Sequence, residues 1–242
     1  MQPTVFITGS SRGIGRAAAL EFAKSGYNVA INGRTYSEDL KSLETQLIQM
    51  GVNVLALAGD VSQPEDVNKM FDMIFERFGK IDLLINNAGI SYVGLITDMT
   101  DEDWRNILDT NLSSVFYCCR RAISSMVHNK SGKIINVSSV WGICGASCEA
   151  AYSATKGGIG AFTKALAKEV APSGISVNAV AFGAVDTDMN KCFSKDEISA
   201  LAEEIPAGRL AAAEEAGKML FDTAQLPDYM TGQIITFDGG WI

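Results

Sequence analysis

The glycine-rich stretch TGSSRGIG, residues 8–15, joins an apolar segment to an amphipathic one. The apolar segment, Val5–Thr8, is predicted to be a strand, and the amphipathic segment, Gly15–Ser25, is predicted to be a helix. A glycine-rich turn between a strand and a helix is typical of a dinucleotide-binding site, whereas the same glycines elsewhere would indicate only a turn.

Each glycine of this stretch has a physical reason to be there. Gly9 permits a tight turn, Gly13 lets the backbone approach a pyrophosphate, and Gly15 lets the helix pack closely on the sheet. The amino terminus of the helix then offers unpaired N–H groups and the positive end of its dipole to phosphates. We therefore predict that this stretch binds the phosphates of a dinucleotide.

The same alternation of short apolar and longer amphipathic segments continues along the whole chain. The apolar segments are rich in Val, Ile and Leu without polar alternation, which is typical of a parallel sheet covered on both faces. Further strands are predicted at Asn28–Asn32, Val54–Ala58, Leu83–Asn86, Lys133–Ser138, Ser176–Ala181 and Gln233–Phe237. Further helices are predicted at Ser37–Met50, Pro64–Phe78, Asp101–His128, Ala151–Ala171 and Ala212–Ala224. We expect one α/β domain, residues 1–242, with a doubly wound Rossmann fold: a seven-stranded parallel sheet with helices on both faces.

Composition excludes several classes of function. The 242 residues are 47% hydrophobic and carry a formal net charge of −8, which argues against nucleic-acid binding. The five cysteines and the single histidine, His128, are not spaced as metal ligands, so we predict no metal site and reduced cysteines. No signal peptide or membrane-spanning segment fits the sequence, and we expect a cytoplasmic protein.

Five further segments follow one another in a recognisable order. Asn86-Asn87-Ala88-Gly89 follows a predicted strand, Asn111 lies in a long predicted helix, and Ser138-Ser139 ends another strand. Tyr152-Ser153-Ala154-Thr155-Lys156 comes next, and Thr231-Gly232-Gln233 with Asp238-Gly239-Gly240 lies near the end. With the G-x-x-x-G-x-G spacing of the first turn, this order resembles the short-chain dehydrogenase/reductase family over essentially the whole chain.

Four of these residues are the predicted catalytic set: Asn111, Ser139, Tyr152 and Lys156. Tyr152 and Lys156 share one helix face, and an ammonium near a phenol lowers the phenol's pKa, which suits Tyr152 as a general acid. Ser139 can donate a hydrogen bond to the carbonyl oxygen of a substrate. The resemblance implies that Lys156 also binds the nicotinamide ribose and that Asn111 holds a water that relays protons to Lys156.

The end of the second predicted strand bears on the choice of cofactor. Gly33 stands where an NAD-binding protein is expected to carry Asp or Glu, and Arg34 follows it. Arg34 and Arg12 favour a 2′-phosphate, because Arg binds phosphate in a bidentate fork, so we predict NADPH; otherwise one or both are solvated surface charges. The resemblance places Asp60 and Val61 beside the adenine and Asn87 beside the nearer ribose. The complete predicted cofactor-binding set is Gly9, Ser11, Arg12, Gly13, Ile14, Gly15, Arg34, Asp60, Val61, Asn87, Ala88, Gly89, Tyr152, Lys156, Gly183, Val185 and Thr187.

The resemblance is greatest to 3-oxoacyl-acyl-carrier-protein reductases, which implies reduction of a carrier-bound or protein-bound ketone to a secondary alcohol. Those reductases engage their acidic carrier through arginines near the ends of the fourth and fifth helices, where this chain has Lys130 and Ser173. Arg120, Arg121 and Lys133 are candidates to compensate, or they are solvated charges on a helix face.

A second substrate class also fits the sequence. The segments Trp141–Glu149 and Ile205–Leu210 resemble a subgroup that reduces the 5-aminopentanone group on a lysine of elongation factor P. Glu149 would pair with the protonated amine of that group, or it is an exposed loop carboxylate. A third alternative, an NADPH-binding sensor or scaffold without activity, is disfavoured by the intact catalytic set. The physiological direction stays open, although NADPH favours reduction.

Two more expectations concern loops and surfaces. Phe182 stands where the family usually has proline, which predicts a more mobile loop at residues 183–194 or a side chain that fills part of the pocket. The fourth and fifth predicted helices carry apolar residues that we interpret as surface: Val115, Phe116, Ile159 and Phe162. By resemblance these helices pair in a homotetramer, and a dimer stays an alternative.

Overall fold

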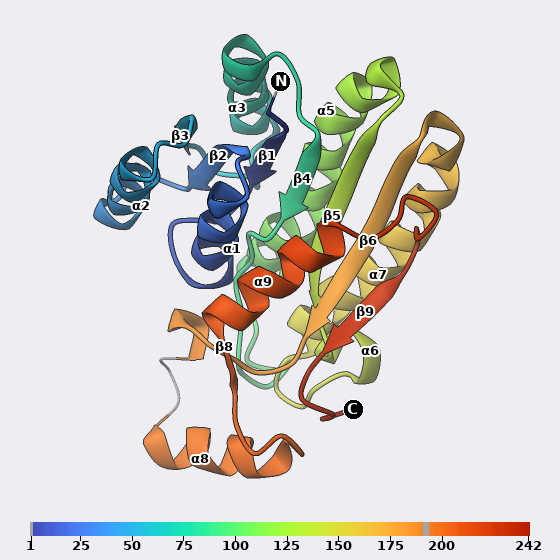
Figure 1. Cartoon of the computed structure of the whole chain (residues 1–242). Helices are drawn as coiled ribbons and strands as arrows, with labels where there is room; N and C mark the ends of the chain where they lie inside the picture. Colours follow the sequence, from blue (N-terminus) through green and yellow to red (C-terminus); the bar gives the residue numbers. More distant parts are fainter. Residues whose placement is uncertain (1, 191–193) are drawn as a thin grey trace.

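The computed structural model describes residues 2–190 and 194–242. Its central sheet has seven strands in the order β3-β2-β1-β4-β5-β6-β9, all paired in parallel (Figure 1). The strands are β1 (Thr4–Ile7), β2 (Asn28–Gly33), β3 (Val54–Ala58), β4 (Leu83–Asn86), β5 (Gly132–Ser139), β6 (Ile175–Phe182) and β9 (Ile234–Phe237). The predicted α/β doubly wound fold is confirmed.

The strand order reverses between β1 and β4. From β1 the chain builds outward through β2 to β3, and from β4 it builds outward in the other direction. In such sheets the crevice outside the carboxyl ends of the strands at this reversal is where ligands bind.

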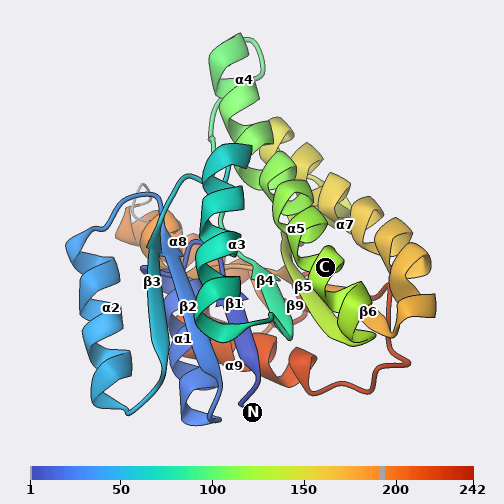
Figure 2. The same ribbon diagram turned by 90° about the horizontal axis from the view of Figure 1, so that it is seen from above.

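Two apolar cores cover the two faces of the sheet. The first contains buried side chains of α1 (Gly13–Lys24), α2 (Glu38–Gln49) and α9 (Ala213–Ala224). The second contains those of α3 (Pro64–Phe78), α5 (Ser114–Asn129) and α7 (Ala150–Val170), which Figure 2 shows along one side of the sheet. In β1, Val5 and Ile7 enter the first core and Phe6 the second, because successive side chains of a strand point to opposite faces.

The long helix predicted over Asp101–His128 is not a uniform α-helix. It consists of α4 (Asp101–Leu108), a π-helical turn η1 (Asp109–Ser113) and α5. The segment begins with a capping box, in which the Thr100 side chain and the Asp103 side chain each bond the other residue's backbone N–H. The π-helical turn contains Asn111, so one predicted catalytic residue lies at the irregular point of the helix.

Several short elements were not predicted. They are α6 (Trp141–Cys144), the 3₁₀ turns η2 (Ala171–Ser173) and η3 (Asp188–Asn190), α8 (Lys195–Glu204), and the strand pair β7 (Val185–Asp186) and β8 (Ala211–Ala212). In Figure 1, α8 lies away from the main sheet, beyond the carboxyl ends of the strands.

The interpretation of Val115 and Ile159 as surface residues is wrong. They are 2% and 1% exposed and belong to the core between the sheet and the helices of its second face. Phe116 is 44% exposed, and Phe162 is half-buried. A helix repeat identifies an apolar stripe, but it does not distinguish the side that meets the sheet from the side that meets solvent.

Among the residues that the structure describes, no helix combines the length and apolarity that crossing a bilayer requires, and no group of His, Cys, Asp and Glu side chains is placed to hold a metal ion. Four of the cysteines, Cys118, Cys119, Cys144 and Cys148, have free thiols, while Cys192 lies outside the described residues.

Candidate active site

The glycine-rich turn forms a tight cradle at the carboxyl end of β1. Gly9 has φ +60°, and a Cβ there would lie 2.7 Å from the Cα of Ala88. A Cβ on Gly15 would lie 2.5 Å from Asn87 Nδ2. The absence of a side chain at Gly15 therefore makes room for this amide and also lets the helix pack closely. Arg12, the residue before α1, makes no side-chain cap, so the first-turn N–H groups are available to an anion. This cradle fits the pyrophosphate of a dinucleotide.

Thr8, which the sequence analysis did not select, holds the cradle to the neighbouring loop. Its Oγ1 accepts the N–H groups of Asn87 and Ala88, each at 3.0 Å. Asn87 Nδ2 in turn donates to the carbonyl oxygens of Thr8 and Gly9 at 3.0 and 2.9 Å. Asn87 and Ala88, both predicted cofactor residues, therefore lie against the glycine-rich turn.

The end of β2 borders the same cradle. A Cβ on Gly33 would lie 3.7 Å from the Cβ of Ser11, so the two loops that carry Arg34 and Arg12 are adjacent. Arg34 is exposed. Arg12 is also exposed, and its Nη1 lies 3.7 Å from Asp188 Oδ2. The two loops are adjacent, but the Arg12 guanidinium is directed toward Asp188, and its convergence with Arg34 on a phosphate stays a prediction.

Five more of the predicted cofactor residues lie in the segments that follow β3 and β6 at this edge. After β3, Asp60 Oδ1 accepts the N–H of Ser62 at 2.9 Å, and Val61 is buried. After β6, Gly183 packs against Asp238, where a Cβ would lie 2.8 Å from the Asp238 Cβ. Val185 is buried. The side chain of Thr187 packs on Gly13, because a Cβ on Gly13 would lie 3.4 Å from Thr187 Cγ2. The structure thus brings this segment onto the phosphate cradle.

Lys156 is buried beneath the loop that follows β4. Its Nζ donates to the carbonyl oxygen of Val137 at 2.9 Å and lies 5.6 Å from the centre of the Tyr152 ring. Burial lowers the pKa of Lys156 to about 8. A Cβ on Gly89 would lie 3.5 Å from this Nζ and 3.3 Å from Asn111 Oδ1, so Gly89 lies between the two side chains.

The hydroxyl of Tyr152 has an environment that keeps it protonated. Burial raises the pKa of Tyr152 to about 12; a hydrogen bond from Ser139 lowers this pKa, and the charge of Glu149 raises it further. The net direction is opposite to the one expected from Lys156, because burial outweighs the other effects. Ser139 is itself fixed, since its Oγ accepts the N–H of Trp141 at 3.2 Å.

Asn111 is fully buried and its amide is occupied by the protein. Its Nδ2 donates to the Ile90 carbonyl at 2.9 Å and to Thr155 Oγ1 at 3.2 Å. Its Oδ1 accepts the N–H of Ile90 at 2.8 Å. The side chain thereby fixes the loop after β4 to α7, and its role with water stays a prediction.

One side of Tyr152 faces an apolar cluster. Tyr152 packs with Ile107 and Ala151, and Ile90, Tyr92, Met99 and Trp141 pack around them. The Trp141 ring contacts that of Trp241, with centroids 4.6 Å apart. Tyr92 and Trp241 were not selected from the sequence, and no local motif marks them. Phe182 is absent from this cluster; it is 3% exposed and packs edge-on against Phe237 in the core, so it does not fill the pocket.

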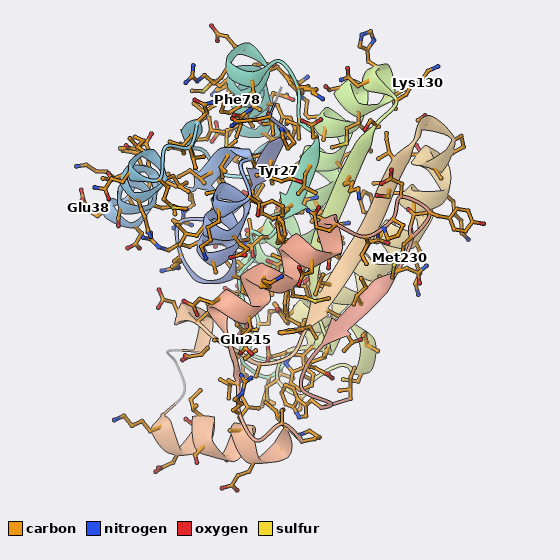
Figure 3. All side chains as sticks on the ribbon, in the orientation of Figure 1. Tyr27, Glu38, Phe78, Lys130, Glu215 and Met230 are labelled. Carbon is orange, nitrogen blue, oxygen red and sulfur yellow. The ribbon has the colours of Figure 1, made fainter. Side chains whose placement is uncertain are left out.

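The basic residues considered for carrier binding lie away from this edge. Lys130 precedes β5, so it lies at the amino ends of the strands, and Figure 3 shows it far from Glu215 at the other end of the sheet. Lys133 Nζ donates to the carbonyl oxygens of Ala224 and Leu226 and pairs with Asp228 at 3.1 Å. Arg121 pairs with Asp72. Within one chain, these cations do not border the catalytic side chains.

A phosphate cradle beside a buried lysine and tyrosine, at the reversal point of a doubly wound sheet, defines an oxidoreductase that works with a bound dinucleotide. Comparison with known proteins agrees. The family described as short chain dehydrogenase matches residues 3–198. The chain belongs to the short-chain dehydrogenase/reductase family.

Relatives cover nearly the full length. The chain is 42% identical to the uncharacterized oxidoreductase YmfI of Bacillus subtilis, over 100% of this chain and 99% of the relative. It is 36% identical to the 3-oxoacyl-[acyl-carrier-protein] reductase FabG of Staphylococcus epidermidis, over 99% of each. It is 38% identical to a 3-oxoacyl-[acyl-carrier-protein] reductase of Synechocystis, over 98% of this chain and 95% of the relative.

Proposed function

We propose that the chain is an NADPH-dependent reductase that converts a ketone to a secondary alcohol, acting most like a 3-oxoacyl-acyl-carrier-protein reductase. The observation that carries this proposal is the buried Lys156–Tyr152 pair beside the phosphate cradle. The similarity to reductases of that name over nearly the full chain supports the substrate class.

The reaction needs a proton donor, an oxygen-binding group and a hydride source. When bound, NADPH supplies the hydride to the carbonyl carbon. Tyr152 donates its proton to the carbonyl oxygen, while Ser139 donates a hydrogen bond to the same oxygen. The Lys156 ammonium then stabilises the phenolate that remains. The raised pKa of Tyr152 suits reduction, because the phenol must carry its proton when the reaction begins.

The preference for NADPH rests on the end of β2. The strand ends in Gly33 without a carboxylate that would repel a 2′-phosphate, and the exposed guanidinium of Arg34 follows it. We expect kcat/KM with NADPH to exceed that with NADH by about 10-fold or more, the value of one charge-assisted contact. Arg34→Ala should remove most of this difference, and NADH equal to NADPH in the unmodified protein would refute the preference.

Acetoacetyl-acyl-carrier protein is the substrate that tests the reaction class. We expect NADPH oxidation that depends on this substrate and is lost in Tyr152→Phe. Elongation factor P bearing 5-aminopentanone serves as the comparison substrate. Turnover of that protein without turnover of the acyl-carrier substrate would refute the proposed class.

We also propose that the chain forms a homotetramer in the cytoplasm. An apolar groove between α5 and α7 supports the assembly; it is lined by Leu112, Ser113, Phe116, Tyr117, Gly158 and Phe162. Light scattering should give four times the mass of the chain, and Phe116→Glu should dissociate the assembly. A monomer at micromolar concentration would refute it.

A further inference from the structure

A carboxylate lies at the edge of the apolar cluster beside Tyr152. Glu149 directly precedes α7 and is half-buried. Its Oε2 accepts the hydroxyl of Ser91 at 3.1 Å, and the side chain of Trp141 also donates to this carboxylate. Ser91 comes from the loop after β4, and Trp141 begins α6. The carboxylate is thus held by two segments that both border the catalytic side chains.

The surroundings of Glu149 leave its charge uncompensated. Both of its partners are neutral hydrogen-bond donors, and the indole N–H can only donate, which favours the ionised carboxylate. Across residues 2–190 and 194–242, no lysine or arginine forms an ion pair with it; the Nζ of Lys156 is directed to the Val137 carbonyl. Burial raises the pKa of Glu149, while the bonds from Ser91 and Trp141 lower it.

This charge is close enough to act on the reacting groups. Trp141 packs beside Tyr152 and also donates to the Glu149 carboxylate, so the carboxylate and the phenol share a neighbour, and the charge of Glu149 contributes to the raised pKa of Tyr152. The side chains around Tyr152, including Ile90, Met99 and Trp141, are apolar and half-buried, which lowers the local dielectric and so strengthens the interaction. A substrate whose carbonyl reaches Tyr152 therefore brings its nearest substituents close to an anion.

We propose that Glu149 is a specificity-determining residue that excludes ketones with a carboxylate close to the carbonyl, as in 3-oxo acids, and admits their neutral esters and thioesters. The inference rests on the proposed ketone reductase activity and deepens it. A 3-oxoacyl thioester is neutral at this place, whereas the free 3-oxo acid is an anion. At an effective dielectric near 20, like charges separated by about 8–11 Å change a rate constant by roughly 10- to 30-fold, and we expect an effect of this order.

The test compares acetoacetate with ethyl acetoacetate, which differ by the charge. The kcat/KM of each is measured with NADPH for the unmodified protein, for Glu149→Gln, and for Glu76→Gln. The control removes one negative charge from the exposed Glu76 on α3, on another part of the surface. Glu149→Gln should raise kcat/KM for acetoacetate about 10-fold or more, with the ester changed less than threefold, and the control should leave the ratio unchanged.

A second measurement does not depend on the folding of a variant. In the unmodified protein, acetoacetate, 4-oxopentanoate and 5-oxohexanoate are each compared with their ethyl esters. The penalty on the acid should decrease as the carboxylate moves away from the carbonyl. If the ester-to-acid ratio of kcat/KM is the same along this series, or is unchanged in an active Glu149→Gln protein, the inference about Glu149 is overturned while the proposed function stands. Absence of NADPH oxidation with every neutral ketone overturns the proposed function, and the inference with it.

Discussion

Because the Lys156 ammonium is buried, we predict that this lysine destabilises the protein in the absence of nucleotide. Its pKa falls from an ordinary value of 10.5 to about 8, a difference equivalent to about 3 kcal/mol. Lys156→Met removes this penalty and also the hydrogen bond to Val137, which contributes about 1 kcal/mol. At pH 7 the variant should therefore be more stable by about 2 kcal/mol, or roughly 4–8 °C in Tm.

The pH dependence gives this prediction its control. A lysine whose pKa is lower in the folded chain destabilises it fully below the folded pKa; the penalty decreases as pH rises above that value and disappears only above the pKa of the unfolded chain. Between pH 7 and 9, the unmodified protein should gain about 1 kcal/mol relative to Lys156→Met. Other titrating groups, such as Cys118 and Cys119, cancel in this difference because both proteins contain them.

Urea unfolding at pH 7, 8 and 9 without nucleotide measures both quantities. Comparison of the two proteins at each pH gives the difference in the free energy of unfolding. A Lys156→Met protein that is less stable than the unmodified one, with an identical pH dependence, would refute the reasoning. The variant should at the same time lose nearly all reductase activity.

Three other substitutions test the site and the core. Tyr152→Phe removes the proton donor, so kcat should fall by about 10²- to 10⁴-fold, while the Kd for NADPH from fluorescence titration changes less than about twofold; retained turnover would contradict the role. Gly15→Ala places a methyl 2.5 Å from Asn87 Nδ2 and should cost about 1–3 kcal/mol and weaken nucleotide binding. Gly160→Ala, with its nearest atom at 3.7 Å, is the matched control, and equal Tm values for the two variants would argue against the cradle. Phe182→Ala removes a buried ring and should lower the free energy of unfolding by about 3–5 kcal/mol; a loss below about 1 kcal/mol would contradict its place in the core.

The positions of the seven sheet strands along the chain could be predicted because each strand is a short apolar segment bounded by polar or glycine residues. The short helix α6 could not, since four residues show no helical repeat. A signal for α8 was present, because Ser194 and Glu197 form a capping box at its start. That helix has no buried residue, so it lacks the apolar stripe on which the prediction depends.

The grouping of the predicted site residues could be predicted, but their electrostatic environment could not. The i,i+4 spacing places Lys156 near Tyr152, but burial depends on segments distant in sequence, and burial determines the net direction of the Tyr152 pKa. The π-helical turn at Asn111 is equally invisible, because its residues are compatible with an ordinary helix. Ser91 and Trp241 carry no motif, and only the fold brings them to the site.

The reversal of strand order between β1 and β4 divides the molecule into two halves that carry different groups of predicted site residues. The residues predicted to bind the nucleotide's phosphates and adenine lie mainly in the segments that follow β1, β2 and β3, whereas Ser139 ends β5 and Tyr152 and Lys156 lie on α7. We therefore expect a substitution at the end of β2 to change the choice of nucleotide while Ser139, Tyr152 and Lys156 stay in place. Cofactor preference and carbonyl chemistry should then be separable traits, which can be selected or redesigned one at a time.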